Sequence, residues 1–280
     1  MAISIVTNVS SLNAQRNLGS TQEALSKSLS RLSSGMRINS AADDAAGLAI
    51  SEKLKSQIRS MSQAERNAND AVSLLQTAEG SMSEVSGMLS RMRELSVQAG
   101  NDTVGAAERG FLQNELADLR SEVNRIAEVT EFNGTKLIDG TASSLTFQVG
   151  IQNTTNDRMS VSINDMHASA LGTGAATRLS GVDISTISGA QTALDVLDSA
   201  ITDVSAGRAS IGAVQNRMQV TIANLATARE NLSAANSRVR DVDVASESAE
   251  LTRKNILMQA GVSVLAQANQ SPSIALSLLG

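Results

Sequence analysis

The chain has 280 residues, of which 41% are hydrophobic but only 1% aromatic, and its formal net charge is -5. A nucleic-acid-binding protein needs a basic surface, so the acidic balance argues against a nucleic-acid partner. The chain has no Cys, which excludes disulfides and thiolate metal sites. With so few aromatic side chains to fill a thick core, the composition favours thin layers of packed helices over one large globule.

The first predicted helix runs from about Asn8 to Arg31. Leu25, Leu29 and Leu32 follow one another at steps of four and three residues, which places them on one helix face. The stretch SSGMRINSAADDAAG then ends this helix. Gly35 is the residue in it that can adopt the left-handed conformation common just after a helix C-terminus.

A second, very long helix is predicted from Asp43 to Ala99. Asn39 or Ser40 can cap it, and Asp43 and Asp44 place negative charge in its first turn, where the helix dipole favours it. Apolar residues recur along it at close to heptad spacing. At ~1.5 Å per residue, its length is on the order of 80 Å, which is typical of a bundle or coiled coil rather than a globular domain.

A third helix follows a break at GNDTVG, residues 100 to 105. Apolar residues from Leu112 to Ile126 step by four and three, which predicts a helix with clean heptad character. The helical period ends near Glu131.

The middle of the chain alternates with a period of two, which predicts a β-hairpin with one buried face. The alternation covers Leu145 to Ile151 and resumes from Met159 to Ile163, and Asn133-Gly134 and Asp139-Gly140 are turn signals. The Gly- and Ser-rich stretch from Asp165 to Gly189 fits either a loop or a further short strand. The helical period returns at Gln191 and continues, less regularly, to Ala268.

These elements predict a mainly α fold: a long antiparallel helical rod, resembling a coiled-coil bundle, made from the N- and C-terminal halves with a small β-hairpin insert. Residues 1-42 form an N-terminal helix that pairs with the C-terminal helix of residues 235-280. Residues 43-234 form the rod domain between them, with the hairpin region at about 131-189. Folding the chain back on itself in this way brings its two ends together.

Both ends of the chain are apolar and uncharged. No ionisable side chain occurs before Arg16, and none occurs after Lys254. Gln, Asn and Pro interrupt the C-terminal stretch, so a membrane span is not predicted. Two paired helices can bury only part of these apolar side chains, which leaves the rest for other copies of the chain, and repeated head-to-tail contacts build helical filaments. The predicted self-assembly residues are Leu25, Leu29, Leu32, Val264, Leu265, Ile274, Leu276, Leu278 and Leu279.

Several long motifs resemble bacterial flagellins. They include RLSSGMRINSAADDAAGLAIS from Arg31 to Ser51, RNANDAVSLLQTAEG from Arg66 to Gly80, and AGVSVLAQANQ from Ala260, in the family's order along essentially the whole chain. The resemblance implies that the terminal helices form the innermost layer of a filament. It also implies a short flagellin, because few residues stand where the variable outer domains of longer members are inserted.

The same resemblance implies a secreted, extracellular location in the flagellar filament, reached through a type III export apparatus, and a role in swimming motility. The implied partners are further copies of the chain, the filament cap, the hook-junction proteins and an export chaperone. Arg91, Leu95 and Glu115 match positions by which many flagellins are bound by the flagellin-sensing Toll-like receptor of animals. The alternative for these three residues is that Leu95 is a core residue and the two charges form a solvated face.

No enzymatic site is predicted. Asp43 and Asp44 have no apparent nucleophile or base partner, and helix capping explains them. His167 is the only histidine, so no His-based zinc pair exists, and a surface position is expected for it. No catalytic, cofactor-binding or metal residue is therefore named. The competing functions are a hook-filament junction protein and a soluble helical adaptor or coiled-coil protein.

Overall fold

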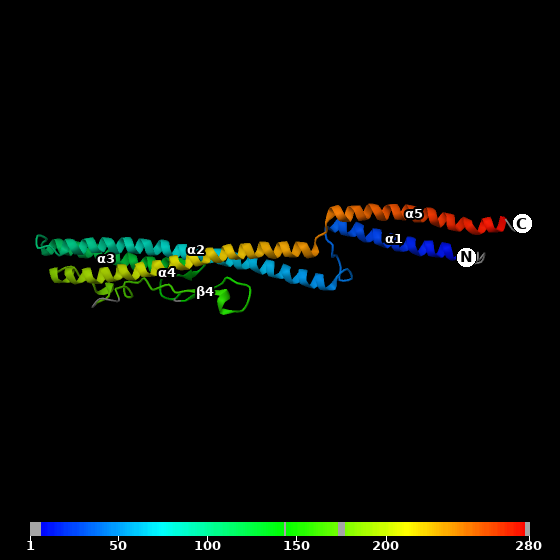
Figure 1. Ribbon diagram of the computed structural model, residues 1–280. Coiled ribbons are helices and arrows are strands. Elements are labelled where there is room, and N and C mark those ends of the chain that lie inside the picture. Colours follow the sequence, from blue (N-terminus) through cyan, green and yellow to red (C-terminus); the bar gives the residue numbers. More distant parts are fainter. Residues whose placement is uncertain (1–6, 143, 173–176, 278–280) are drawn as a thin grey trace. The chain divides into compact units, whose positions relative to one another are not determined.

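The computed structural model describes residues 7–142, 144–172 and 177–277, with side chains up to residue 270. Five long helices dominate this part of the chain: α1 (Val9–Ser34), α2 (Ala45–Ala99), α3 (Ala106–Val129), α4 (Ile187–Arg240) and α5 (Val244–Ser277) (Figure 1). The mainly α fold with a small hairpin insert is thereby confirmed. The chain packs as two compact units, one of Met1–Ile58 with Glu230–Gly280 and the other of Arg59–Arg229. Helices α2 and α4 contribute to both.

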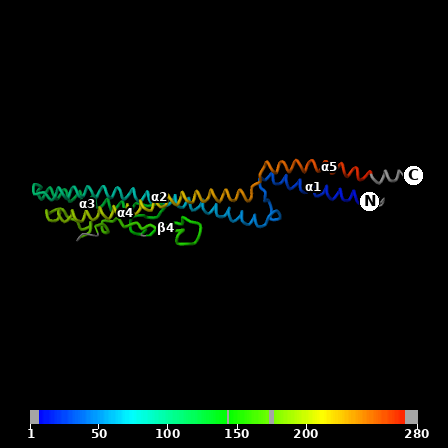
Figure 2. Tube along the Cα trace, viewed as in Figure 1, coloured from blue at the N-terminus to red at the C-terminus, as the bar shows by residue number. Residues whose placement is uncertain are grey.

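In the first unit α1 and α5 run antiparallel, side by side (Figure 2). Near one end of the pair, Nδ2 of Asn8 donates to the carbonyl of Ala268 at 2.7 Å. Towards the other end, Nζ of Lys254 donates to Oγ of Ser28 at 2.8 Å. The described residues nearest the two chain ends therefore lie together, as the folded-back layout predicts.

The turn from α1 to α2 is fixed by one glycine and two aspartates. Gly35 follows α1 with φ 68°, so its predicted left-handed conformation is confirmed. The prediction that Asn39 or Ser40 caps α2 is wrong, because Oδ1 of Asp44 accepts from the amide of Gly47 at 2.8 Å and fills that role. The Asp43 carboxylate reaches back to the amides of Asn39 and Ser40 instead.

The helical period that continues from Gln191 to Ala268 contains a break that the sequence analysis missed. α4 ends at Arg240, and α5 begins after Asp243, whose Oδ1 accepts from the amide of Ala245 at 3.0 Å. An aspartate that caps the next turn competes with helix continuation, and this is the signal that marks the break. The two linkers also pair, since Val242 donates to the carbonyl of Gly35 at 3.1 Å.

The beginning of α2 packs with the terminal unit. Oγ of Ser51 donates to Oδ1 of Asn236 at 2.7 Å, and Arg240 pairs with Glu52 at 2.7 Å. The division by packing falls at residues 58/59 and 229/230, inside α2 and α4. Of the predicted boundaries, 42/43 lies in the turn from α1 to α2 and 234/235 lies inside α4.

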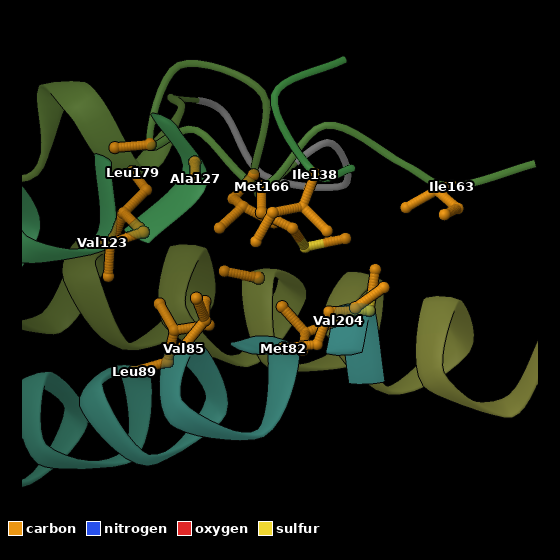
Figure 3. Packing of buried hydrophobic residues seen from close by; sticks show 14 of the residues in the cluster. Met82, Val85, Leu89, Val123, Ala127, Ile138, Ile163, Met166, Leu179 and Val204 are labelled. Carbon is orange, nitrogen blue, oxygen red and sulfur yellow. The ribbon is translucent and has the colours of Figure 1, made fainter. Parts of the chain in front are cut away.

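In the second unit α2, α3 and α4 enclose one apolar core (Figure 3). α2 and α4 are antiparallel, because Arg93 pairs with Asp198 at 2.6 Å while Glu65, earlier on α2, pairs with Arg229, later on α4. Loop residues close the core from a further side. Members shown in Figure 3 are Met82, Val85, Leu89, Val123, Ala127, Ile138, Ile163, Met166, Leu179 and Val204.

The predicted hairpin is confirmed, and a smaller one precedes it. β1 (Glu131–Phe132) and β2 (Thr135–Lys136) are joined by Asn133 and Gly134, both with positive φ, as a tight two-residue turn requires. β3 (Leu145–Gln148) pairs antiparallel with β4 (Arg158–Val161). A short 3-10 helix, Thr155–Asp157, lies in their connection.

The stretch from Asp165 to Gly189, for which loop and strand were both open, holds no strand in its described part. It contains a 3-10 helix, Leu179–Gly181, and α4 already begins at Ile187.

Candidate self-assembly interface

The three predicted self-assembly leucines of α1 have different surroundings. Leu25 is 6% exposed and packs inside the α1–α5 pair, and Leu32 is half-buried. Leu29 is 51% exposed. Of these three, Leu29 therefore offers the most apolar surface to another molecule, while Leu25 stabilises the pair itself.

The predicted self-assembly residues of α5 also differ in exposure. Val264 is 56% exposed, whereas Leu265 is half-buried. The side chains of Ile274 and Leu276, and the residues Leu278 and Leu279, lie outside the part of the chain that the structure describes.

The terminal helix pair exposes further large apolar side chains that sequence periodicity did not single out. They are Val9, Leu12, Val244, Ile256, Leu257 and Val262, each more than half exposed. Periodicity identifies the face that meets the partner helix, so residues off that face escape it. For Val9, Leu12 and Val262 the signal is the uncharged sequence around them, whereas Val244, Ile256 and Leu257 have charged neighbours and gave no such signal.

A shallow groove of about 270 Å³ runs along the pair. Small residues form its floor, because Gly261 lets Cδ1 of Leu18 approach to within 3.2 Å of where a Cβ would stand. The lining residues are Ala14, Asn17, Leu18, Thr21, Leu257, Ala260, Gly261 and Val264. We call this groove, together with the exposed large apolar side chains of α1 and α5, the terminal face.

Polar contacts fix how the two helices pair. Arg31 approaches Glu247 at 3.8 Å, and Nε of Arg31 and Oε1 of Glu247 are buried without a hydrogen-bond partner in the described residues. Lys254, 18% exposed, bonds Ser28, which is itself buried. The bond between Lys254 and Ser28 favours one alignment of the helices, because a shift would leave these two buried polar groups unsatisfied.

The residues predicted for receptor contact lie where α2 and α3 face each other. Arg91 bridges Glu115 at 2.9 Å and Glu94 at 3.0 Å, and all three side chains are largely exposed. These hydrogen bonds, that of Glu115 first, raise the pKa of Arg91. Leu95 is 0% exposed and belongs to the core, so the surface at this point consists of the ion pair without the leucine.

His167 is less exposed than expected. Its side chain is 20% exposed, with Nδ1 2.6 Å from Asp165 and Nε2 3.4 Å from Glu128. The ring therefore reaches the surface but is partly covered, because it lies between these two carboxylates. In Glu128, the hydrogen bond from Lys136 is the main cause of a lowered pKa.

None of the helices in the described part of the chain has an apolar stretch of the length and hydropathy needed to cross a bilayer.

Paired terminal helices with an apolar face left uncovered, joined to a helical unit that carries a hairpin, define a subunit of a self-assembling helical polymer. Comparison with known proteins gives the family. Residues 5–143 match the bacterial flagellin N-terminal helical region, and residues 194–279 match the C-terminal helical region. The chain belongs to the bacterial flagellin family.

Two relatives extend over nearly the whole chain. A flagellin of Halalkalibacterium halodurans is 46% identical over 97% of this chain and 98% of its own length. A flagellin of Bacillus subtilis is 45% identical with the same coverage. The structure of a putative flagellar hook-associated protein from Vibrio parahaemolyticus, 14% identical, superposes with a TM-score of 0.60 over 71% of this chain and all of its own, which shows a shared fold.

The protein is accordingly a structural subunit of the extracellular bacterial flagellar filament, which polymerises with further copies of itself.

Proposed function

We propose that the terminal face of α1 and α5 is the surface through which this subunit packs against its copies in the filament. The observation that carries the proposal is the set of large apolar side chains on this helix pair that stay more than half exposed in the single chain, Leu29 and Val264 among them. Contiguous exposed apolar surface marks an interaction site. An uncharged groove between them gives an apolar partner a place to pack.

Within this scheme the parts of the chain have separate roles. Residues 1-42 and 235-280 supply the apolar inner layer, with Leu25, Leu32 and Leu265 holding α1 and α5 together and Leu29 and Val264 facing other subunits. Ile274, Leu276, Leu278 and Leu279 belong to the same layer by sequence. Residues 43-234, with the hairpin region at 131-189, form the rod domain that connects them along the chain.

Deletion of each end tests the assignment. Purified chain seeded with filament fragments is expected to form long tubes in negative stain, and deletion of residues 1–32 or 255–280 is expected to abolish them. A matched control deletes the α2–α3 loop tip, residues 101–104, which lies outside the terminal face. If both terminal deletions still form normal tubes, the terminal face is not part of the assembly surface.

The further partners are proposals that rest on the family. They are the filament cap, the hook-junction proteins, a chaperone that holds the chain for type III export, and the flagellin-sensing Toll-like receptor. One observation favours the receptor, namely the exposed ion pair of Arg91 with Glu115 on adjoining helices. An Arg91→Ala, Glu115→Ala double variant is expected to lower receptor activation in a reporter-cell assay, and unchanged activation would contradict the contact.

A further inference from the structure

The linker that follows α1 and the linker that follows α4 pair with each other as a short antiparallel ladder. Met36 forms an isolated β-bridge with Asp241, and the amide of Arg37 donates to the carbonyl of Arg240 at 2.6 Å. The side chain of Arg37 adds a further bond, because its Nη2 donates to the carbonyl of Val239 at 2.7 Å. We call this pairing the linker crossing. It holds Met36 beside the last turn of α4.

The side chain of Arg240 uses the sulfur of Met36 as a hydrogen-bond acceptor. Its Nε donates to Sδ of Met36 at 3.0 Å, while its Nη1 donates to Oε1 of Glu52 at 2.7 Å. Only 12% of the Arg240 side chain is exposed. A thioether is a weak acceptor, so this largely buried cationic donor receives poor compensation for the water it has lost. Among the residues whose side chains the structure describes, no other methionine sulfur accepts a hydrogen bond.

Solvent reaches Met36 but not the methionines of the core. Met36 is half-buried, whereas Met82, Met92, Met166 and Met218 are fully buried. The subunit belongs to an extracellular filament, where dissolved peroxides can reach it. A methionine that is open to solvent is a site at which the sulfoxide forms.

We propose that Met36 is a site of oxidative modification, at which hydrogen peroxide converts the thioether to a sulfoxide and thereby strengthens the linker crossing. A lone pair of Sδ attacks one peroxide oxygen, so that an S–O bond forms while the O–O bond breaks. The sulfur gives up two electrons and the peroxide is reduced. The second oxygen takes the proton of the first and leaves as water.

The new oxygen gives Arg240 the strong acceptor that it lacks. Rotation about the Cγ–Sδ bond of Met36 turns the sulfoxide oxygen toward Nε, and a bond from a guanidinium to such an oxygen is charge-assisted. In an apolar core a sulfoxide disrupts packing, because it places a polar group among apolar ones. At Met36 the polar oxygen meets a largely buried donor instead. The effect on stability therefore has the opposite sign.

The arginine also determines which sulfoxide forms. A thioether sulfur has two lone pairs, and in Met36 one of them faces the Nε–H of Arg240. Peroxide can attack only through the other one, so a single epimer of the sulfoxide is favoured. The two epimers are distinguishable, because each is reduced by a different methionine sulfoxide reductase.

The epimer ratio gives the first test. The unpolymerised chain is treated with hydrogen peroxide and digested, and the Met36 peptide is incubated with either reductase and measured by mass spectrometry. One reductase is expected to remove the Met36 sulfoxide in excess of the other by about fivefold or more. Arg240→Lys is the matched control, because lysine keeps a cation for Glu52 but lacks Nε, and its ratio is expected to fall close to equality. Equal epimers in the wild type, or a bias that Arg240→Lys leaves unchanged, would overturn the proposal.

Thermal melting gives the second test, in a chain whose other half-buried methionines are replaced by Met61→Leu, Met88→Leu and Met258→Leu. Peroxide treatment is expected to raise its melting temperature by about 2 °C, and the same chain carrying Met36→Leu as well should show no shift. An unchanged or lowered melting temperature, once mass spectrometry has shown the sulfoxide at Met36, contradicts the strengthening. A Met36 that stays unoxidised under peroxide that oxidises Met61 of the wild type contradicts the site itself.

Discussion

Replacing Leu29 by Ala separates the stability of the single chain from the stability of the filament. Leu29 is 51% exposed, so about half of its side chain has already left water in the single chain. Ala is at least as good a helix former as Leu, so helix propensity does not oppose the change, and the single chain loses only the covered half of the side chain, worth about 1 kcal/mol. The exposed half of the Leu29 side chain is available for burial against another subunit.

The size of the effect follows from that exposed half. Full burial of a Leu side chain contributes about 2 to 3 kcal/mol, so burial of the exposed half contributes about 1 kcal/mol per subunit on assembly. At 1.4 kcal/mol for each tenfold change in an equilibrium constant, Leu29→Ala raises the critical concentration for polymerisation about fivefold.

The assay is sedimentation of seeded polymerisations over a range of subunit concentrations, with circular dichroism melting of the unpolymerised chain beside it. Leu29→Ala is expected to raise the critical concentration and to lower the melting temperature only slightly, by the loss of its covered half. Leu89→Ala is the matched control, because Leu89 is 0% exposed in the core of the second unit and its truncation costs about 2 to 5 kcal/mol of folding stability. An unchanged critical concentration for Leu29→Ala, together with a lowered melting temperature, would refute the reasoning.

Two further predictions concern the turn from α1 to α2. Gly35→Ala places a Cβ on a residue with φ 68°, which costs about 1 to 2 kcal/mol, and thermal melting should show the loss while Gly19→Ala, inside α1 with open space around it, does not. Asp43 pairs with Lys27 at 2.6 Å, and the hydrogen bond from Lys27 is the main cause that holds the pKa of this carboxyl below its usual range. A carboxyl whose pKa is lowered in the folded state stabilises the fold at pH values above the ordinary carboxyl pKa. This stabilisation is lost as the pH falls through and below that ordinary value. The difference in melting temperature between wild type and Asp43→Asn should therefore be full at pH 6 and shrink below about pH 4. A difference that grows on acidification would contradict this sign.

Local signals in the sequence were sufficient for most of the secondary structure. Apolar steps of three and four residues predicted α1, α2 and α3 to within a few residues, and Gly35 ended α1 as expected because few other residues adopt a left-handed backbone without cost. The period of two and the Asn133-Gly134 turn predicted the strands, because backbone geometry at these positions depends on neighbours in sequence.

Other features depended on groups that are distant in sequence or that compete for one role. Asp44, rather than Asn39 or Ser40, caps α2, because the helix begins at Ala45 and the side chains of Asn39 and Ser40 bond Ser30 and Asp43 instead. The break before α5 is likewise a competition, between helix continuation and capping by Asp243.

The sequence by itself determined the family, the helices and the apolar character of both ends, because these follow from residue order and local periodicity. Only the tertiary structure decided which apolar residues are covered. Leu25 and Leu29 occupy one predicted face, yet the first is buried against α5 and the second is open, and the exposed Phe111 gave no periodic signal. Periodicity states which side chains share a face, but burial depends on how far the neighbouring helix extends over that face, and that is a property of packing.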